Sequence, residues 1–174
     1  MTLIDSIITK SLPLLPKWFA KPFAKPYVAG ETVSEALSKV KKLNQRGFSA
    51  TIDILGEHVK EIKSARSITD QYCSLYEEID HNSIDCTISV KPTHIGLNIS
   101  QSEAVSNMTQ IARKASELGN FLRIDMESSV FTDQTFELYK ECKTIYNNVG
   151  VAIQAYLYRS ENDIKNLGGS KFNS

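Results

Sequence analysis

The sequence predicts an α/β fold with a parallel sheet, because segments typical of strands alternate strictly with segments typical of helices. The predicted strands begin near residues 48, 86, 121 and 150. A repeat of about 30–38 residues is the size of a βαβ unit. No strand is followed by a GxGxxG fingerprint, and no P-loop motif occurs, which argues against dinucleotide-binding and P-loop folds. Together these observations favour a (β/α) barrel.

Two of the predicted helices begin with a capping box, in which a side-chain oxygen accepts from the backbone N–H three residues later. Thr32 and Glu35 begin one, and Ser100 and Glu103 begin the other. Gly47 and Gly119 predict where these helices end. The apolar stripes expected on them are Val33, Ala36 or Leu37, Val40 and Leu43 in the first, and Ala104, Met108, Ile111, Ala115 and Leu118 in the second.

The other elements follow from the same alternation. The predicted strands are residues 48–55, 86–90, 121–125 and 151–155, with a turn at 147–150 before the last. Another helix has Ile68, Tyr72, Leu75 or Tyr76, and Ile79 on one face, and a further helix carries Leu138, Cys142 and Ile145. A last helix is predicted to begin near Glu161.

Length limits the size of the barrel. An eight-stranded barrel takes about 250 residues, whereas this sequence has 174 and reaches its fourth strand by residue 155. We therefore expect a TIM-like barrel truncated to roughly its first four strands, or else an open four-stranded sheet. The expected organisation is a Pro-rich helical arm over residues 1–30 and a partial barrel over 31–174. Such a half-barrel is expected to expose bare edges and an apolar inner face, and so to self-associate.

Composition narrows the function classes. The chain has 20 basic and 20 acidic residues, so it lacks the strongly basic balance of a nucleic-acid binder. Cys73, Cys86 and Cys142 form no CxxC pair, and are expected to be reduced packing residues of a cytoplasmic protein. The three histidines stand at no ligand spacing with these cysteines, so no metal site is predicted.

Residues 1–28 combine lysines and aromatic side chains with four of the five prolines. The lysines and prolines interrupt the segment too often for a membrane-spanning helix. Two alternatives remain. We favour an arm that packs on the domain, because dense prolines break an amphipathic face. The other is a basic segment that places Trp18 and Phe19 peripherally at the inner face of the membrane.

Polar residues gather where the predicted strands end, at the edge where parallel α/β folds carry their chemistry. They are Asp53 with Glu57, Lys91, Asp125 with Glu127, and Gln154. These residues are interpreted either as a functional site or as structural ion pairs at the barrel mouth. A strand-end lysine stays charged if paired and falls in pKa if not. His94 is expected to be a loop residue rather than a catalytic base.

Five segments, in order and at natural spacing, resemble the proline dehydrogenase family, most closely its short monofunctional microbial form. They are residues 27–32 (YVAGET), 50–57 (ATIDILGE), 88–97 (ISVKPTHIGL), 123–127 (RIDME) and 154–159 (QAYLYR). The resemblance covers about residues 25–173. It implies a distorted (β/α) barrel that holds FAD at the carboxyl ends of its strands. It further implies oxidation of L-proline to pyrroline-5-carboxylate, with electrons passed to a quinone.

The resemblance also implies roles for single residues. Lys91 matches the catalytic lysine that lies beside the flavin and binds the proline carboxylate, and Asp125 matches a catalytic aspartate in the flavin-side hydrogen-bond network. Gln154 matches the glutamine at the edge of the flavin ring. Glu57 matches a glutamate that gates the site by pairing with an arginine, and Asp53 matches the aspartate two positions before the Leu-Gly pair.

This sequence departs from the family by lacking the Arg-x-x-Lys-Gly-x-Tyr motif of the fifth strand and the later helix with paired arginines. The expectation is therefore an incomplete, inactive fragment. Three alternatives stay open. A separate chain supplies the other half in a split enzyme, Lys91 serves a Schiff-base lyase, or the chain is a remnant without activity.

Overall fold

The computed structural model describes residues 28–167, and within them four strands form one parallel sheet. The strands are β1 (Ala50–Ile52), β2 (Cys86–Val90), β3 (Leu122–Ile124) and β4 (Val149–Val151). Each pairs in parallel with the next along the chain, in the order β1-β2-β3-β4. The predicted alternation of strands and helices, and the parallel sheet, are confirmed.

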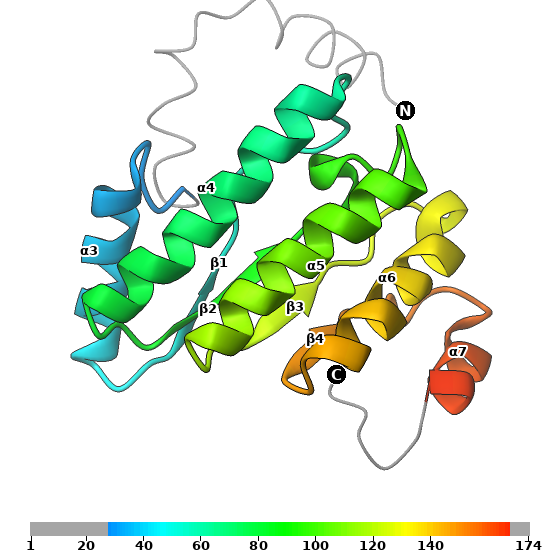
Figure 1. Ribbon diagram of the computed structural model, residues 1–174. Helices are drawn as coiled ribbons and strands as arrows, with labels where there is room; N and C mark the ends of the chain where they lie inside the picture. The colour runs from blue at the N-terminus through cyan, green and yellow to red at the C-terminus, as the bar shows by residue number, and fades with distance from the viewer. Residues whose placement is uncertain (1–27, 168–174) are drawn as a thin grey trace, which may run out of the picture.

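Helices cover one face of this sheet. In Figure 1, α4 (Ile62–His81), α5 (Gln101–Glu117) and α6 (Thr132–Ile145) lie side by side over the strands. Helix α3 (Val33–Asn44) contacts β1, and α7 (Ser160–Leu167) follows β4. Two short 3₁₀ helices, η2 (Pro92–Ile95) and η3 (Ser129–Phe131), follow β2 and β3.

Local sequence rules account for both capping boxes. Thr32 Oγ1 accepts from the backbone N–H of Glu35 at 3.3 Å, and Ser100 Oγ accepts from that of Glu103 at 3.4 Å. Gly47 ends the turn after α3 with φ of +83°, in the left-handed region that favours glycine. The stripe predicted for α3 is partly wrong, because Leu37 and Val40 are buried but Val33 and Leu43 are exposed. The buried part of α3 is thus limited to about one turn, and this helix contacts the edge strand β1.

Two predicted strands have different bounds in the structure. β1 is limited to residues 50–52, and Phe48 and Leu55, predicted to be in it, are exposed. The fourth strand is confirmed, but β4 covers Val149–Val151, so it begins two residues and ends four residues earlier than the expected 151–155. The turn expected at 147–150 is therefore wrong for residues 149 and 150. The backbone N–H of Leu122 donates to Asn148 O, and that of Ala152 donates to Ile124 O. Pairing with β3 therefore determines where β4 lies.

The apolar side chains of the strands lie between the sheet and the helices. Five of these side chains are completely buried and belong to the same core cluster as side chains of α4, α5 and α6: Ile88, Val90, Leu122, Ile124 and Val149. Because successive strand residues point to opposite faces, the residues between them occupy the uncovered face.

The uncovered face is polar. Thr51 is paired with Thr87 and Ser89 with Arg123, and the two threonine hydroxyls are 2.8 Å apart. The expectation that a half-barrel exposes an apolar inner face is therefore wrong. All the large apolar side chains of β2 and β3 sit at the alternate positions that face the helices.

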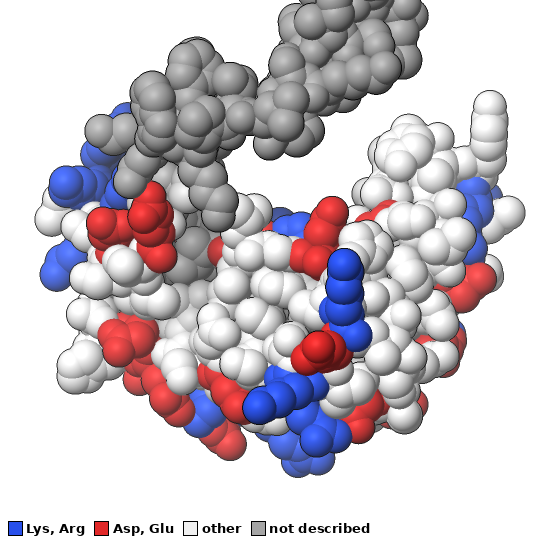
Figure 2. Space-filling view, turned by 90° about the horizontal axis from the view of Figure 1, so that it is seen from above, with Lys and Arg blue, Asp and Glu red and all other residues white. Residues whose placement is uncertain are grey.

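Charge and hydropathy agree with the balanced composition. The face seen in Figure 2 carries acidic and basic side chains close together rather than a patch of one sign. Among residues 28–167, no helix has the length and apolar character needed to cross a membrane.

Cys86 and Cys142 are buried and unpaired, as expected of packing residues, and Cys73 is half-buried. The arm predicted for residues 1–30, with Trp18 and Phe19, lies almost wholly outside the described residues.

Candidate functional site

Lys91 and Asp53 meet at the carboxyl ends of β2 and β1, as the sequence predicts. Lys91 Nζ donates a hydrogen bond to the Asp53 carboxylate, and both side chains are partly exposed. Burial alone would lower the pKa of Lys91, but the hydrogen bond and charge of Asp53, helped by Asp125 and Glu127, outweigh it and raise that pKa. Lys91 therefore keeps its positive charge at neutral pH.

Asp125 follows β3 and is held by a residue that sequence reasoning missed. Ser89 Oγ donates a hydrogen bond to Asp125 Oδ1. The backbone N–H of Asp125 donates to Val90 O at 2.9 Å, which extends the β2–β3 ladder beyond the strand. Ser89 could have been found from its position, because it lies two residues before Lys91 and thus on the same face of β2.

Glu127, the second carboxylate after β3, binds Thr93 rather than Lys91. Glu127 Oε1 accepts from Thr93 Oγ1 at 2.7 Å, and Oε2 accepts from the backbone N–H of Thr93 at 2.8 Å. The Thr93 hydroxyl also accepts from the backbone N–H of His58 at 3.0 Å. Thr93 was not predicted as a site residue. The available signal was a small polar residue directly after the Lys91-Pro92 pair at a strand end.

Glu57 lies beside these groups on the loop between β1 and α4. Possible ligand atoms of Glu57, His58 and Glu127 all lie within 4.8 Å of one another. Spacing along the chain does not reveal this cluster. Since both carboxylate oxygens of Glu127 accept from Thr93, and Glu57 and His58 are exposed, we assign no metal to it.

Gln154 follows β4 and offers a buried acceptor. Its Nε2 donates to Met126 O at 3.4 Å, whereas its Oε1 is buried and accepts no hydrogen bond from residues 28–167. Its backbone carbonyl accepts from Ser160 Oγ at 2.6 Å. A buried acceptor without a donor is unfavourable, so this amide is suited to a ligand that brings an N–H group.

His94 lies in η2 rather than in a loop, and it is 5% exposed. Its ring meets Tyr72 edge-on, with centroids 6.4 Å apart, and Nδ1 has no partner among the described residues. A Cβ on Gly56 would lie 2.4 Å from His94 Nε2, so only glycine fits there. Burial lowers the pKa of His94, and the charge of Lys91 lowers it further. These contacts favour a packing role over that of a base.

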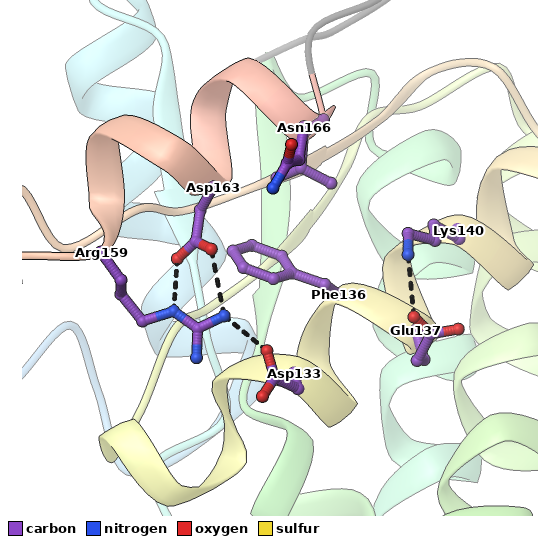
Figure 3. Close-up of a pocket in the computed structure, with 8 residues that line it drawn as sticks. Asp133, Phe136, Glu137, Lys140, Arg159, Asp163 and Asn166 are labelled. Atoms are coloured by element: carbon purple, nitrogen blue, oxygen red, sulfur yellow. Dashed lines mark hydrogen bonds and ion pairs between the residues drawn. The ribbon is translucent and has the colours of Figure 1, made fainter.

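A separate hollow of about 270 Å³ lies between α6 and α7. Figure 3 shows Arg159 at its edge, with its guanidinium directed at Asp133 of α6 and Asp163 of α7. Arg159 Nε and Nη2 donate to the two oxygens of Asp163 at 2.7 and 3.0 Å, and Nη2 also donates to Asp133. Arg159 thereby joins the loop that carries Gln154 to the neighbouring helix.

Comparisons with known proteins agree on one family. The family model described as proline dehydrogenase matches residues 36–169. Proline dehydrogenase 1 of Bacillus subtilis subsp. natto is 36% identical over 160 residues, which are 89% of this chain and 53% of that protein. Proline dehydrogenase of Deinococcus radiodurans is 29% identical over 149 residues, which are 83% of this chain and 48% of that protein. The chain thus spans about half the length of the curated relatives it matches.

Solved structures give the same fold. Proline utilization A (PutA) from Bdellovibrio bacteriovorus, inactivated by N-propargylglycine, superposes with a TM-score of 0.73 at 25% identity, over 80% of this chain and 18% of that one. A bifunctional PutA superposes with a TM-score of 0.63 at 23% identity, over 78% of this chain and 16% of that one. The α/β barrel architecture expected from the sequence is therefore confirmed.

Proposed function

Because this chain belongs to the proline dehydrogenase family, we propose that it supplies part of the active site for FAD-dependent oxidation of L-proline to pyrroline-5-carboxylate. The observation that carries this proposal is Lys91, a cation held by Asp53 at the carboxyl end of β2. Asp125, the next strand-end carboxylate, extends the β2–β3 ladder beside it. A fixed cation at this edge suits an amino-acid substrate, because it neutralises the substrate carboxylate.

Each residue has a proposed task. Lys91 binds the proline carboxylate, and its raised pKa keeps it protonated for that purpose. Asp125, oriented by Ser89, takes part in the hydrogen-bond network beside the flavin. Glu57, exposed at the same edge, gates the site by pairing with an arginine.

The residues present fit a flavin. The buried Oε1 of Gln154 is an acceptor to which no described residue donates, and the edge of the flavin ring carries an N–H donor. FAD, when bound, accepts a hydride from the substrate. We propose that Gln154 and Asp125 contact this cofactor, and that a quinone takes the electrons, as the family resemblance implies.

The active unit needs more strands than residues 28–167 provide. Small closed barrels have about eight strands, and the described residues form four. We propose that the remaining strands, on this polypeptide or on another, pair with β1 and β4 and bring the arginine partner of Glu57. Self-association through these two edges is the competing arrangement. Contact of residues 1–28 with a membrane stays a proposal as well, since those residues lie outside the described part.

The Schiff-base alternative is less well supported. A lysine nucleophile must lose its proton, and enzymes achieve this by lowering its pKa. The carboxylate of Asp53 raises the pKa of Lys91 instead. Failure to trap a lysine adduct with borohydride and a carbonyl substrate would exclude this alternative.

The proposed function can be tested by supplying the other half-barrel. The chain is mixed with FAD and with the carboxyl-terminal half of the Bacillus subtilis relative, and proline-dependent dye reduction is measured. We expect activity in the mixture. Lys91→Met should abolish it, whereas Lys165→Met, which replaces an exposed lysine of α7, should keep it. N-propargylglycine, which inactivates the PutA relative, is expected to inactivate the mixture. Flavin binding without any proline oxidation would contradict the proposal.

A further inference from the structure

Thr93 connects two loops of the carboxyl edge through a single buried side chain. It is 0% exposed, and it lies in η2, two residues after Lys91. Its hydroxyl donates to Glu127 Oε1 at 2.7 Å and accepts from the backbone N–H of His58 at 3.0 Å. One hydroxyl therefore joins the loop after β3 to the loop after β1.

The backbone of Thr93 strengthens both connections. Its N–H donates to Glu127 Oε2 at 2.8 Å, so Thr93 holds both oxygens of that carboxylate. Its carbonyl accepts from the backbone N–H of Val59 at 3.4 Å, next to the His58 contact. Asn98 Nδ2 also holds this loop, by donating to Val59 O at 2.8 Å.

The loop held in this way has an unfavourable backbone conformation. His58 has a φ of +51°, in the left-handed region that residues other than glycine seldom adopt. Such a conformation persists only where surrounding contacts stabilise it. The hydrogen bond from His58 N–H to Thr93 Oγ1 is one of these contacts, and Glu57 immediately precedes His58 in the loop.

Electrostatics explains why Glu127 needs two hydrogen bonds. A carboxylate oxygen of Glu57 lies within 4.8 Å of a carboxylate oxygen of Glu127. Two negatively charged carboxylates at such a distance repel each other. A neutral donor that holds both oxygens of Glu127 keeps it in place against this repulsion. Valine has nearly the same shape as threonine, yet it can neither donate to Glu127 nor accept from His58.

We propose that Thr93 is a positioning residue, which holds Glu57 and Glu127 in one arrangement beside Lys91 and thereby sets how tightly the site binds the substrate amino acid. The proposal rests on the proposed function. Thr93 acts through the two loops that it joins, rather than through contact with the substrate or the cofactor.

The first arm of the test does not depend on activity. Hydrogen exchange of the His58 amide is compared in the wild type, Thr93→Val and Thr93→Ser. We expect exchange to accelerate about tenfold or more in Thr93→Val, because the acceptor is lost, and to stay near the wild-type rate in Thr93→Ser. The Ile124 amide in β3 is the internal control, and its exchange is expected to change little. An unchanged His58 rate in Thr93→Val would overturn the proposal.

The second arm uses the FAD-loaded protein complemented with the other half-barrel. We expect Thr93→Val to raise KM for proline by about threefold or more with a smaller change in kcat, and Thr93→Ser to restore KM. Accelerated exchange with an unchanged KM would overturn the positioning role and leave the proposed function intact. If the wild-type mixture does not oxidise proline, the proposed function fails, and the exchange data alone decide whether Thr93 holds the loop.

Discussion

Lys91 and Asp53 form an ion pair across two neighbouring parallel strands, each residue lying just beyond the end of its strand. Strand pairing brings Thr51 opposite Thr87. Asp53 and Lys91 are thus one diagonal step apart on the uncovered face. The pair explains how a partly buried lysine can remain charged at an edge where burial alone would favour the neutral amine.

Asp53→Asn is expected to lower the pKa of Lys91. The substitution removes the charge that raises this pKa, while the burial that lowers it remains. The measurement is an NMR titration of Lys91 after reductive ¹³C-methylation of the lysines. Glu161→Gln, which breaks the exposed pair with Lys165, serves as control and should leave the Lys91 titration unchanged. A Lys91 pKa that stays the same in Asp53→Asn would show that the ion pair is unimportant in solution.

Residues governed by local rules could be predicted from the sequence. Thr32 and Ser100 cap their helices through the residues that the capping-box spacing indicates. The bounds of β2 are also those expected, because its apolar residues are followed at once by Lys91 and Pro92. Strand-end positions of Asp53, Lys91 and Asp125 follow from the same local reasoning.

Residues whose place depends on distant partners could not be predicted. Val149 looks like part of a turn because Asn147, Asn148 and Gly150 surround it, but pairing with β3 makes it the first residue of β4. Thr93 becomes significant only when the loops after β1 and β3 meet at its hydroxyl. The polar character of the uncovered face could not be predicted either, because it depends on the register of all the strands, which spacing along the sequence does not provide.

Arg159→Lys is expected to loosen α7 without unfolding the domain. Lysine keeps the charge but cannot hold Asp163 with two nitrogen atoms while also reaching Asp133. Amides of α7 should therefore exchange faster, while global stability changes little, as is usual for solvent-exposed ion pairs. Lys165→Gln on the same helix is the matched control and should leave exchange nearly unchanged. Equal exchange in both variants would rule out Arg159 as the anchor of α7.

His94 is expected to make stability fall below neutral pH. Its folded-state pKa lies below the unfolded value of about 6.5, because burial and Lys91 outweigh the opposing effects of Asp53, Glu127 and Ile54. The unfolded chain then binds more protons in that interval, so the stabilisation is complete above about pH 6.5 and is lost as the pH falls toward the folded value. Urea unfolding between about pH 7 and 5 should show a smaller slope for His94→Gln than for the wild type. The control is Val33→Ala, which replaces an exposed side chain without removing a titratable group and should keep the wild-type slope.

The three cysteines are expected to differ in reactivity toward a thiol reagent at pH 8. Burial raises the pKa of Cys142 to about 12 and that of Cys86 to about 11, so almost no thiolate forms at either. The pKa of Cys73 is also raised, mainly by burial, but its side chain is half-buried and within reach of solvent. One thiol should therefore react before unfolding and two only in urea, and Cys73→Ser should remove the early phase. Two early thiols would contradict the packing of the core.

Ile88→Ala and Val33→Ala are expected to lower the free energy of unfolding by different amounts, because Ile88 lies in the core and Val33 on the surface. Ile88 is 0% exposed in a central strand, so its truncation leaves a cavity and should lower the free energy of unfolding by roughly 2–5 kcal/mol. Val33 is 45% exposed, although helical periodicity predicts it in the apolar stripe, and its truncation should change the free energy of unfolding by less than about 0.5 kcal/mol. Urea denaturation of both variants under the same conditions makes the comparison. A loss of more than about 1 kcal/mol in Val33→Ala would mean that α3 packs on the domain more closely than its exposure indicates.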